Sequence, residues 1–506
     1  RYGWAPLTLE QMDCTMARAY AMALPGSLDG ASSAVGIKAK KDAAGHRLMM
    51  KMSQPATYKK GSSGPEWHET PELLERLFEY CAQDIVVTRE LDGRLLALSP
   101  SEKEIWILDQ KINNYGVQCD TKAVNLCIEL VEAEQRRLDE AIREVTDNRV
   151  ATTRAHIQMK AWIQEQCPLL DVEGVAKDDV LYLLDYPLLP PVARQALQIR
   201  QEAAKSSTKK LQAMAFRSDY RGRMRGLFQY HGSSTGRWAG RAIQPQNFPR
   251  PTLEQDQIEF LFDEVIHKAS SVDELRENIL MFHDRVLDTI SSCLRGFICS
   301  RADRELLTAD FNAVEARVIA WLAGEESVLK LFREDGEVYK EAASVIFGVP
   351  VEKVTKQQRL VGKVAILALG YQGGVGAFQT MARGYNITMA PAFDAVWDAA
   401  SQSRRDYAIK RWDTDGKRAG IEKREWLASE LTKLAWREAN PNIVAYWSLV
   451  ERAAATAMRL PNTPIHLGPD LPSVTFIQRG SFLFCKLPAG RNLCYPYPEM
   501  QVKDTP

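Results

Sequence analysis

Apolar residues recur with helical spacing along most of the chain. From residue 101 to 214 the pattern predicts long amphipathic helices, and from 325 to 458 it predicts helix almost throughout. Between 215 and 250 it changes to short strands and turns, and strands are predicted again from Thr475 onward. The fold class that follows is α/β with a heavy helical content.

A strand, a turn and a helix are predicted in direct succession around Asp310. Residues 305–309 form the predicted strand, which delivers Asp310 at its C-terminal end, and an apolar helical face begins at Val314. A carboxylate in this place can bind a hard cation such as Mg²⁺. It can equally cap the following helix, and this segment alone leaves both interpretations open.

A second helix, predicted within residues 358–374, combines cations with a strongly apolar surface. Arg359, Lys363, Leu367 and Tyr371 are spaced by four residues and so share one slowly drifting face. The surrounding residues are apolar, which predicts buried cations, and buried cations need anionic partners. A triphosphate is one such partner, and ordinary salt bridges are the alternative.

Composition narrows the class of protein. The 506 residues include 65 basic and 65 acidic side chains and are 45% hydrophobic, which is typical of a globular protein and excludes a disordered one. No stretch approaches the roughly 20 apolar residues of a membrane span. The nine cysteines form no C-x-x-C pair, so a zinc site or a disulfide framework is not expected and a reducing compartment is.

The zero net charge hides one strongly basic region. Between Arg200 and Arg250 there are eleven Lys or Arg residues and two acids, with six aromatic residues interleaved. Cations, hydroxyls and glycines suit a phosphate backbone. A solvated loop is the alternative interpretation.

Four motifs in this order resemble those of the family A (DNA polymerase I-like) DNA polymerases, in particular the bacteriophage branch. The motifs are Tyr80-x3-Asp84, Thr235-Gly236-Arg237 with Gln246-Asn247-Phe248-Pro249, Asp310-Phe311-Asn312-Ala313-Val314-Glu315, and Arg359-x3-Lys363-x3-Leu367-x3-Tyr371.

The resemblance implies roles for the residues near the nucleotide. Asp310 would hold the catalytic metals, and Arg359 and Lys363 would bind the incoming triphosphate. Glu315 would be the steric gate that excludes a ribose 2′-hydroxyl, and Tyr371 would lie by the templating base. Phe311 and Leu367 complete the implied substrate-binding set.

The resemblance also implies DNA contacts and a nuclease remnant. Arg237 would contact the primer terminus in the minor groove, beside Thr235, Arg241, Gln246 and Asn247. Lys205 and Lys209 would meet phosphates at the base of the thumb. Tyr80 and Asp84 would be a remnant of a 3′–5′ proofreading exonuclease.

The implied architecture is a right-hand polymerase fold preceded by part of a 3′–5′ exonuclease domain, with helical thumb and fingers and an antiparallel palm sheet. Its expected domains are the exonuclease-like part (1–100), the thumb (101–214), the first part of the palm (215–324), the fingers (325–460) and an incomplete palm return (461–506).

Three departures from the family pattern qualify this picture. Leu367 stands where cellular members have an aromatic residue, and Asn312 and Ala313 replace a Ser/Gln-like pair. The chain has no His-Asp-Glu, the motif that supplies the second metal-binding carboxylate. We expect this motif beyond Pro506, and the missing exonuclease carboxylates before Arg1, in a longer polypeptide.

The implied function is template-directed DNA synthesis in phage replication, by two-metal nucleotidyl transfer to a primer 3′-hydroxyl with Mg²⁺ as cofactor. The expected partners are primer-template DNA, deoxynucleoside triphosphates and phage replication proteins. A monomer without a membrane segment, in the host bacterial cytoplasm, is expected. The alternatives are a non-catalytic primer-template binding remnant or half of a split polymerase, and a single-subunit RNA polymerase, which Glu315 argues against.

Overall fold

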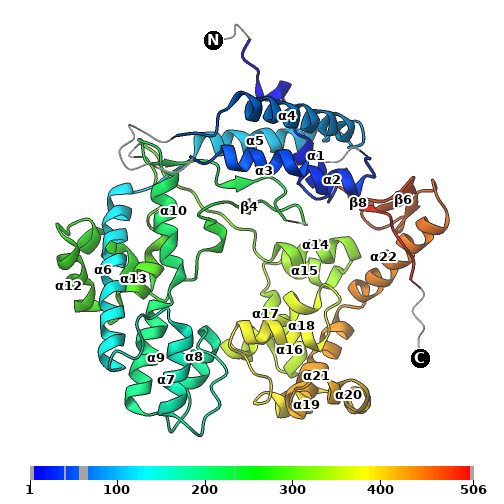
Figure 1. Ribbon diagram of the computed structural model, residues 1–506. Coiled ribbons are helices and arrows are strands. Elements are labelled where there is room, and N and C mark those ends of the chain that lie inside the picture. The colour runs from blue at the N-terminus through cyan, green and yellow to red at the C-terminus, as the bar shows by residue number, and fades with distance from the viewer. Residues whose placement is uncertain (1–4, 39–41, 56–65, 234, 302, 502–506) are drawn as a thin grey trace. The chain divides into compact units, whose positions relative to one another are not determined.

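The structure is a computed structural model that describes residues 5–38, 42–55, 66–233, 235–301 and 303–501. It divides into two compact units, many of whose helices and strands are labelled in Figure 1. Unit 1 comprises Arg1–Ala21 and Pro100–Thr308, and unit 2 comprises Met22–Ser99 and Ala309–Pro506. The five domain boundaries proposed from the sequence remain predictions.

Unit 1 is built mainly from helices. These are α1 (Thr15–Ala21), α5 (Pro100–Tyr115), α6 (Thr121–Val145), α7 (His156–Gln166), α8 (Lys177–Leu184), α9 (Pro191–Ala203), α10 (Lys209–Arg217), α11 (Gln255–Phe260), α12 (Val272–Phe282) and α13 (Val286–Ser292). Its two small antiparallel sheets pair β1 (Val117–Gln118) with β2 (Arg223–Met224), and β3 (Phe228–Gln229) with β4 (Ala239–Gly240).

Helix α6 joins two hydrophobic cores of unit 1. Its first half, with Val124, Cys127 and Leu130, packs against α10 and the helices after residue 255. Its last turns contribute Ile142 to a second core with α7, α8 and α9. Asp120 starts the helix, since its Oδ1 accepts the backbone N–H of Ala123 at 2.9 Å.

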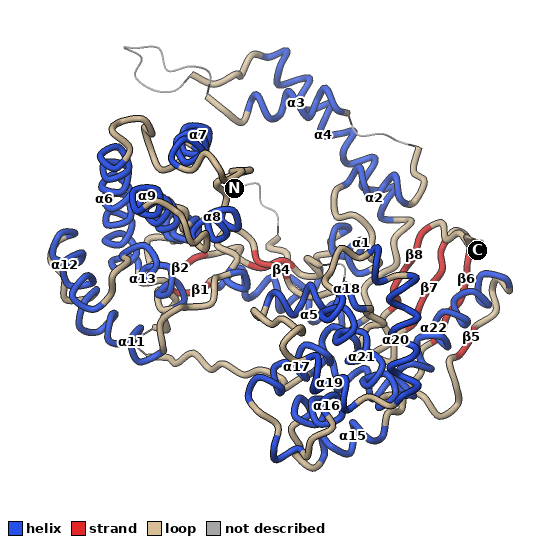
Figure 2. Tube along the Cα trace, turned by 90° about the horizontal axis from the view of Figure 1, so that it is seen from below, coloured by secondary structure: helices blue, strands red, loops and turns tan. Residues whose placement is uncertain are grey.

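Unit 2 holds the remaining helices and one larger sheet. The helices are α2 (Leu28–Ala34), α3 (Ala43–Met52), α4 (Pro71–Asp92), α14 (Val314–Ala323), α15 (Glu326–Arg333), α16 (Val338–Phe347), α17 (Lys356–Leu369), α18 (Val375–Gly384), α19 (Phe393–Ala399), α20 (Gln402–Thr414), α21 (Lys423–Ala439) and α22 (Pro441–Arg459). The antiparallel sheet has the order β5 (Ile465–His466), β6 (Thr475–Arg479), β7 (Phe482–Lys486) and β8 (Asn492–Pro496), with α22 against it (Figure 2).

The predicted helix-rich α/β composition with small antiparallel sheets is confirmed. The predicted strand at residues 305–309 is wrong, because residues 304–311 form no helix or strand and pair with no described strand. Leu307 is 92% exposed there. A strand needs a hydrogen-bonded neighbour, and Leu306 and Leu307 of this segment lie in solvent. No described helix is long and apolar enough to cross a bilayer.

Helix α17 is the central element of unit 2. Its capping box is complete: Thr355 Oγ1 accepts the Gln358 backbone N–H at 3.2 Å, and Gln358 Oε1 accepts that of Thr355 at 3.0 Å. The buried residues Val361, Val364, Ala365 and Ala368 form one stripe along it. That stripe packs against α16, α18 and α21.

Gly362 allows α16 and α17 to pack backbone against backbone. A Cβ added at this glycine would lie 2.1 Å from the carbonyl oxygen of Tyr339 and 3.0 Å from the backbone nitrogen of Ala343. Neither is the end of a flexible side chain, so the helices would have to move apart.

We expect Gly362→Ala to lower the free energy of unfolding by about 1–3 kcal/mol through overpacking, although alanine favours helix by about 1 kcal/mol. Gly376→Ala in α18 is the matched control, because its Cβ would meet nothing within 4 Å. Denaturant unfolding of both variants measures the difference. A Gly362→Ala protein as stable as Gly376→Ala would contradict the close contact.

Candidate functional site

Asp310 lies at the exposed end of an extended segment in unit 2. Phe311 beside it is 80% exposed. Ala313 follows in the left-handed region, with φ 50°, which is uncommon for a residue other than glycine. This turn starts α14 and places Glu315, half-buried, in the first helical turn.

The four predicted residues around α17 occupy its more exposed side. Arg359, Lys363 and Leu367 are half-buried, and Tyr371 lies two residues beyond the helix end with 59% of its surface exposed. The prediction that the two cations are buried is therefore wrong. Lys363 lies two residues beyond Val361, or rather more than half a helical turn, and so faces away from the core stripe.

Arg359 and Lys363 have different neighbours. Arg359 forms a two-pronged ion pair with Glu337: its Nη2 lies 3.0 Å from Oε1, and its Nε binds the other carboxylate oxygen. Bonding to Arg359 lowers the pKa of Glu337. The Lys363 ammonium instead lies 5.2 Å from the ring centroid of Tyr385, and among the described residues it has no carboxylate partner.

Tyr339 lies beside Arg359 and interacts electrostatically with Glu315. The Arg359 guanidinium lies 5.3 Å from the centroid of its ring. Burial raises the pKa of the Tyr339 hydroxyl most, with a smaller contribution from the carboxylate of Glu315 among others. Glu315 therefore lies within electrostatic reach of Tyr339, whose ring also lies beside the Arg359 guanidinium.

The turn that carries Tyr371 is held by two side chains from α21 and α22. Trp447 Nε1 donates to the Gly370 carbonyl at 3.2 Å, and Arg437 Nη2 donates to that of Gly373 at 3.1 Å. The Arg437 guanidinium also lies 5.5 Å from the Trp447 ring centroid. Sequence analysis missed this support because it lies more than 60 residues away from the turn.

The part of the chain that the structure describes contains no group of three His, Cys, Asp or Glu side chains that could hold a metal ion. Asp310 offers a single carboxylate, which forms no hydrogen bond or ion pair with the other described residues. Mg²⁺ commonly takes one or two carboxylates together with substrate phosphates. The donor chemistry of Asp310 fits one protein ligand of such an ion.

Five of the seven predicted DNA-contact residues of unit 1 lie between residues 235 and 247 and are exposed. They are Thr235, Arg237, Arg241, Gln246 and Asn247. Ser233 organises the loop, since its Oγ accepts the Arg237 backbone N–H at 3.1 Å and lies 3.0 Å from Thr235 Oγ1. Arg241 donates through Nε to Gln229 Oε1 at 2.8 Å.

One face of α5 anchors the segment around β3 and β4 that carries Arg237, which we call the basic loop. Asp109, which is buried, accepts a hydrogen bond from Trp238 Nε1 at 2.7 Å. Glu102 accepts one from the Tyr230 hydroxyl at 2.6 Å, and Asn113 exchanges two with the Phe228 backbone. Burial raises the pKa of Asp109, while the hydrogen bond from Trp238 opposes that rise.

The remaining predicted residues lie elsewhere in each unit. Lys205 forms an ion pair with Asp288, and Lys209 is exposed at the start of α10. Tyr80 and Asp84 lie one turn apart on α4. Burial and a hydrogen bond to Asp84 raise the pKa of Tyr80 to about 12. The nuclease origin of this pair remains a prediction.

Comparisons with known proteins place these residues in context. The model of DNA polymerase family A matches residues 127–396. The DNA polymerase of Bacillus phage SP02 is 35% identical over 505 residues, which cover 98% of this chain and 69% of that protein. DNA polymerase I of Pseudomonas aeruginosa is 39% identical over 74 residues, 15% of this chain and 8% of that protein.

Among solved structures, the POL domain of Pol1 from M. smegmatis, in complex with DNA primer-template and dNTP, resembles this chain with a TM-score of 0.44. The identity is 14%, over 88% of this chain and 71% of that one. The residues matched by the family model run from 127 to 396 and include every predicted nucleotide and DNA contact from Lys205 to Tyr371.

We expect Asp109→Ala to loosen the basic loop, because the indole N–H of Trp238 loses a hydrogen bond to a carboxylate, worth about 1.5–3 kcal/mol. Hydrogen exchange of the backbone between residues 228 and 241 should become faster. Glu104→Ala, an exposed carboxylate on the same helix, is the control and should leave exchange unchanged. Equal exchange in the two variants would rule out the anchoring role.

Proposed function

This chain belongs to DNA polymerase family A and carries out template-directed DNA synthesis, and from that premise we propose that the exposed side of α17 binds the incoming deoxynucleoside triphosphate. The binding residues are Arg359 and Lys363, with Leu367 and Tyr371 farther along the same side.

The observation that carries this proposal is the environment of Lys363. The residue is half-buried, its ammonium lies 5.2 Å from the ring centroid of Tyr385, and it has no carboxylate partner among the described residues. A half-buried cation is stabilised by an anion, and a triphosphate supplies several negative charges. Arg359, one turn earlier on the helix, offers the planar fork that binds phosphate in two places once it leaves Glu337.

Asp310 is proposed as a ligand of the divalent metal that family A polymerases use, here Mg²⁺. When bound, such an ion activates the primer 3′-hydroxyl and neutralises charge on the phosphate. The protein's own residues position the nucleotide: Arg359 and Lys363 fix its phosphates, and Glu315 obstructs a 2′-hydroxyl. Tyr371, on a turn fixed by Trp447 and Arg437, lies by the templating base.

Unit 1 is proposed to bind the primer-template. Arg237, Thr235, Gln246 and Asn247 are exposed on or beside the loop anchored to α5, and such contacts in a minor groove read shape more than sequence. Lys205, Lys209 and Arg241 provide phosphate contacts. We propose that the enzyme acts as a monomer in the cytoplasm of the host bacterium, together with phage replication proteins.

In the polymerase that contains this chain, Asp310→Asn should reduce primer extension by about three orders of magnitude or more. The reason is the loss of a metal ligand worth several kcal/mol in the transition state. Primer-template affinity should change little, because no phosphate contact is removed. Single-turnover extension and DNA binding are measured together, with Asp398→Asn as an exposed control. Extension near the wild-type rate would refute the metal-ligand role.

Lys363→Ala should lower kcat/KM for the nucleotide about a hundredfold, because one preorganised cation at the phosphates is removed. Lys356→Ala, at the exposed first residue of the same helix, is the matched control and should behave like the wild type. The measurement is the extension rate as a function of nucleotide concentration. An unchanged nucleotide dependence in Lys363→Ala would exclude the triphosphate contact.

A further inference from the structure

Unit 1 contains a large cavity that none of the proposed polymerase contacts uses. Its volume is about 1270 Å³, and it is lined by the end of α5, strand β1, the start of α6, residues 221–225 and residues 299–301. Pockets for small ligands are commonly about 300–1,000 Å³. None of the seven predicted DNA-contact residues of unit 1 lies in its wall.

The wall of the cavity is strongly basic. Six of its residues carry a positive charge and one a negative charge; the cations are Lys111, Lys122, Arg221, Arg223, Arg225 and Arg301. The one acid, Asp120, is already engaged, because it caps α6 and its Oδ2 lies 2.8 Å from His267 Nε2. The other charges in the wall are all positive, so the cavity attracts a negatively charged ligand.

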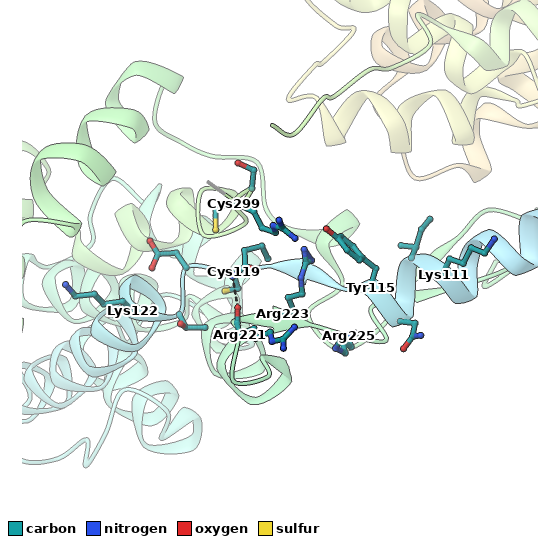
Figure 3. Close-up of a pocket in the computed structure, with 15 residues that line it drawn as sticks. Lys111, Tyr115, Cys119, Lys122, Arg221, Arg223, Arg225 and Cys299 are labelled. Carbon is teal, nitrogen blue, oxygen red and sulfur yellow. Dashed lines mark hydrogen bonds between the residues drawn. The ribbon is translucent and has the colours of Figure 1, made fainter. Parts of the chain in front are cut away.

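The cations differ in how firmly they are held. Arg225 binds Asp219, and Arg301 binds Asp303, each at hydrogen-bond distance. Lys111, Lys122 and Arg221 are exposed and have no ion-pair partner among the described residues. Figure 3 shows the labelled cations in a row, from Lys122 at the start of α6 to Lys111 on α5, rather than around one point.

The row follows from the local backbone. In the sequence Arg221-Gly222-Arg223-Met224-Arg225 the glycine and the methionine are buried, and the three arginines line the cavity. Gly222 has φ +73°, and a Cβ there would lie 2.8 Å from Gln118 Nε2. The antiparallel pairing of Arg223 with Gln118 and of Met224 with Val117 holds Arg223 in place.

An aromatic surface lies within the row. Tyr115 is 58% exposed, and the guanidinium of Arg223 lies 3.9 Å from the centroid of its ring. Arg223 is held by a 2.9 Å hydrogen bond from its Nη1 to the Gly116 carbonyl. An aromatic ring beside backbone-binding cations is the arrangement on which unpaired bases stack.

We propose that this cavity is a second nucleic-acid site, which binds single-stranded DNA. The cations meet successive phosphates, and one base stacks on Tyr115. The row favours an extended polyanion over a single nucleotide. The exposed ring favours unpaired bases over an acidic polypeptide, which would need the charges alone.

The test measures binding of a fluorescent oligothymidylate of about 12 nucleotides to the protein in the presence of saturating unlabelled blunt hairpin duplex, over a range of salt concentrations. The wild-type protein should still bind the oligonucleotide. The triple variant Lys111→Glu, Lys122→Glu, Arg221→Glu should bind about tenfold more weakly or worse. Its slope of log K against log salt should fall by about two, at roughly 0.7 for each lost phosphate contact.

Two controls distinguish a loss of binding at this site from a general effect of added negative charge and from misfolding of the variant. The variant Lys268→Glu, Lys353→Glu, Lys410→Glu makes the same charge change at exposed positions outside the cavity and should bind like the wild type. Tyr115→Ala should weaken binding about tenfold, whereas Tyr115→Phe, which keeps the ring, should not.

Three outcomes would overturn the proposal. In the first, the hairpin displaces the oligonucleotide from the wild-type protein, so a single site binds both. In the second, the cavity variant and the control variant bind equally well. In the third, polyglutamate competes as well as oligothymidylate and Tyr115→Ala has no effect, which would assign the cavity to an acidic polypeptide.

Discussion

The backbone contact between α16 and α17 at Gly362 determines the geometry of the proposed nucleotide site. Because no side chain separates the helices there, the carbonyl of Tyr339 lies directly against α17. This brings the start of α16, with Glu337 and Tyr339, beside Arg359. The apolar stripe of α17 faces the core, so its cations are left at the surface, where they can exchange a protein carboxylate for a phosphate.

Unit 1 uses the same division between anchoring and exposed residues. The polar face of α5 binds the backbone of Phe228 and the side chains of Tyr230 and Trp238, while Arg237 between them stays exposed. The buried carboxylate of Asp109 is thus used for structure and not for chemistry. A loop held in this way presents its cations to DNA without a large ordering cost on binding.

Local signals in the sequence were sufficient for the helices but not for their environment. The four-residue spacing of Arg359, Lys363 and Leu367 correctly indicated helix α17 with these residues along one side. The burial of its cations was predicted wrongly, although the stripe that includes Val361 and Val364 already placed Lys363 on the other side. The segment at 305–309 had a strand-like pattern, but a strand depends on a partner that its own residues do not specify. Glu337 and Tyr385 could not be identified, because only the packing of α16 and α18 brings them to α17. The arginines at 221–225 belong to the basic region recognised in the sequence, but the cavity that they line was not predicted.

The central claim is that the exposed side of α17 receives the triphosphate, and photo-crosslinking tests it most directly. A deoxynucleoside triphosphate with a photoreactive group on its γ-phosphate is bound to the polymerase with primer-template DNA and irradiated, and the modified peptide is sequenced. The account predicts attachment within residues 337–339, 359–371 or at Tyr385. Attachment confined to the basic segment between Arg200 and Arg250, with none on α17, would contradict it.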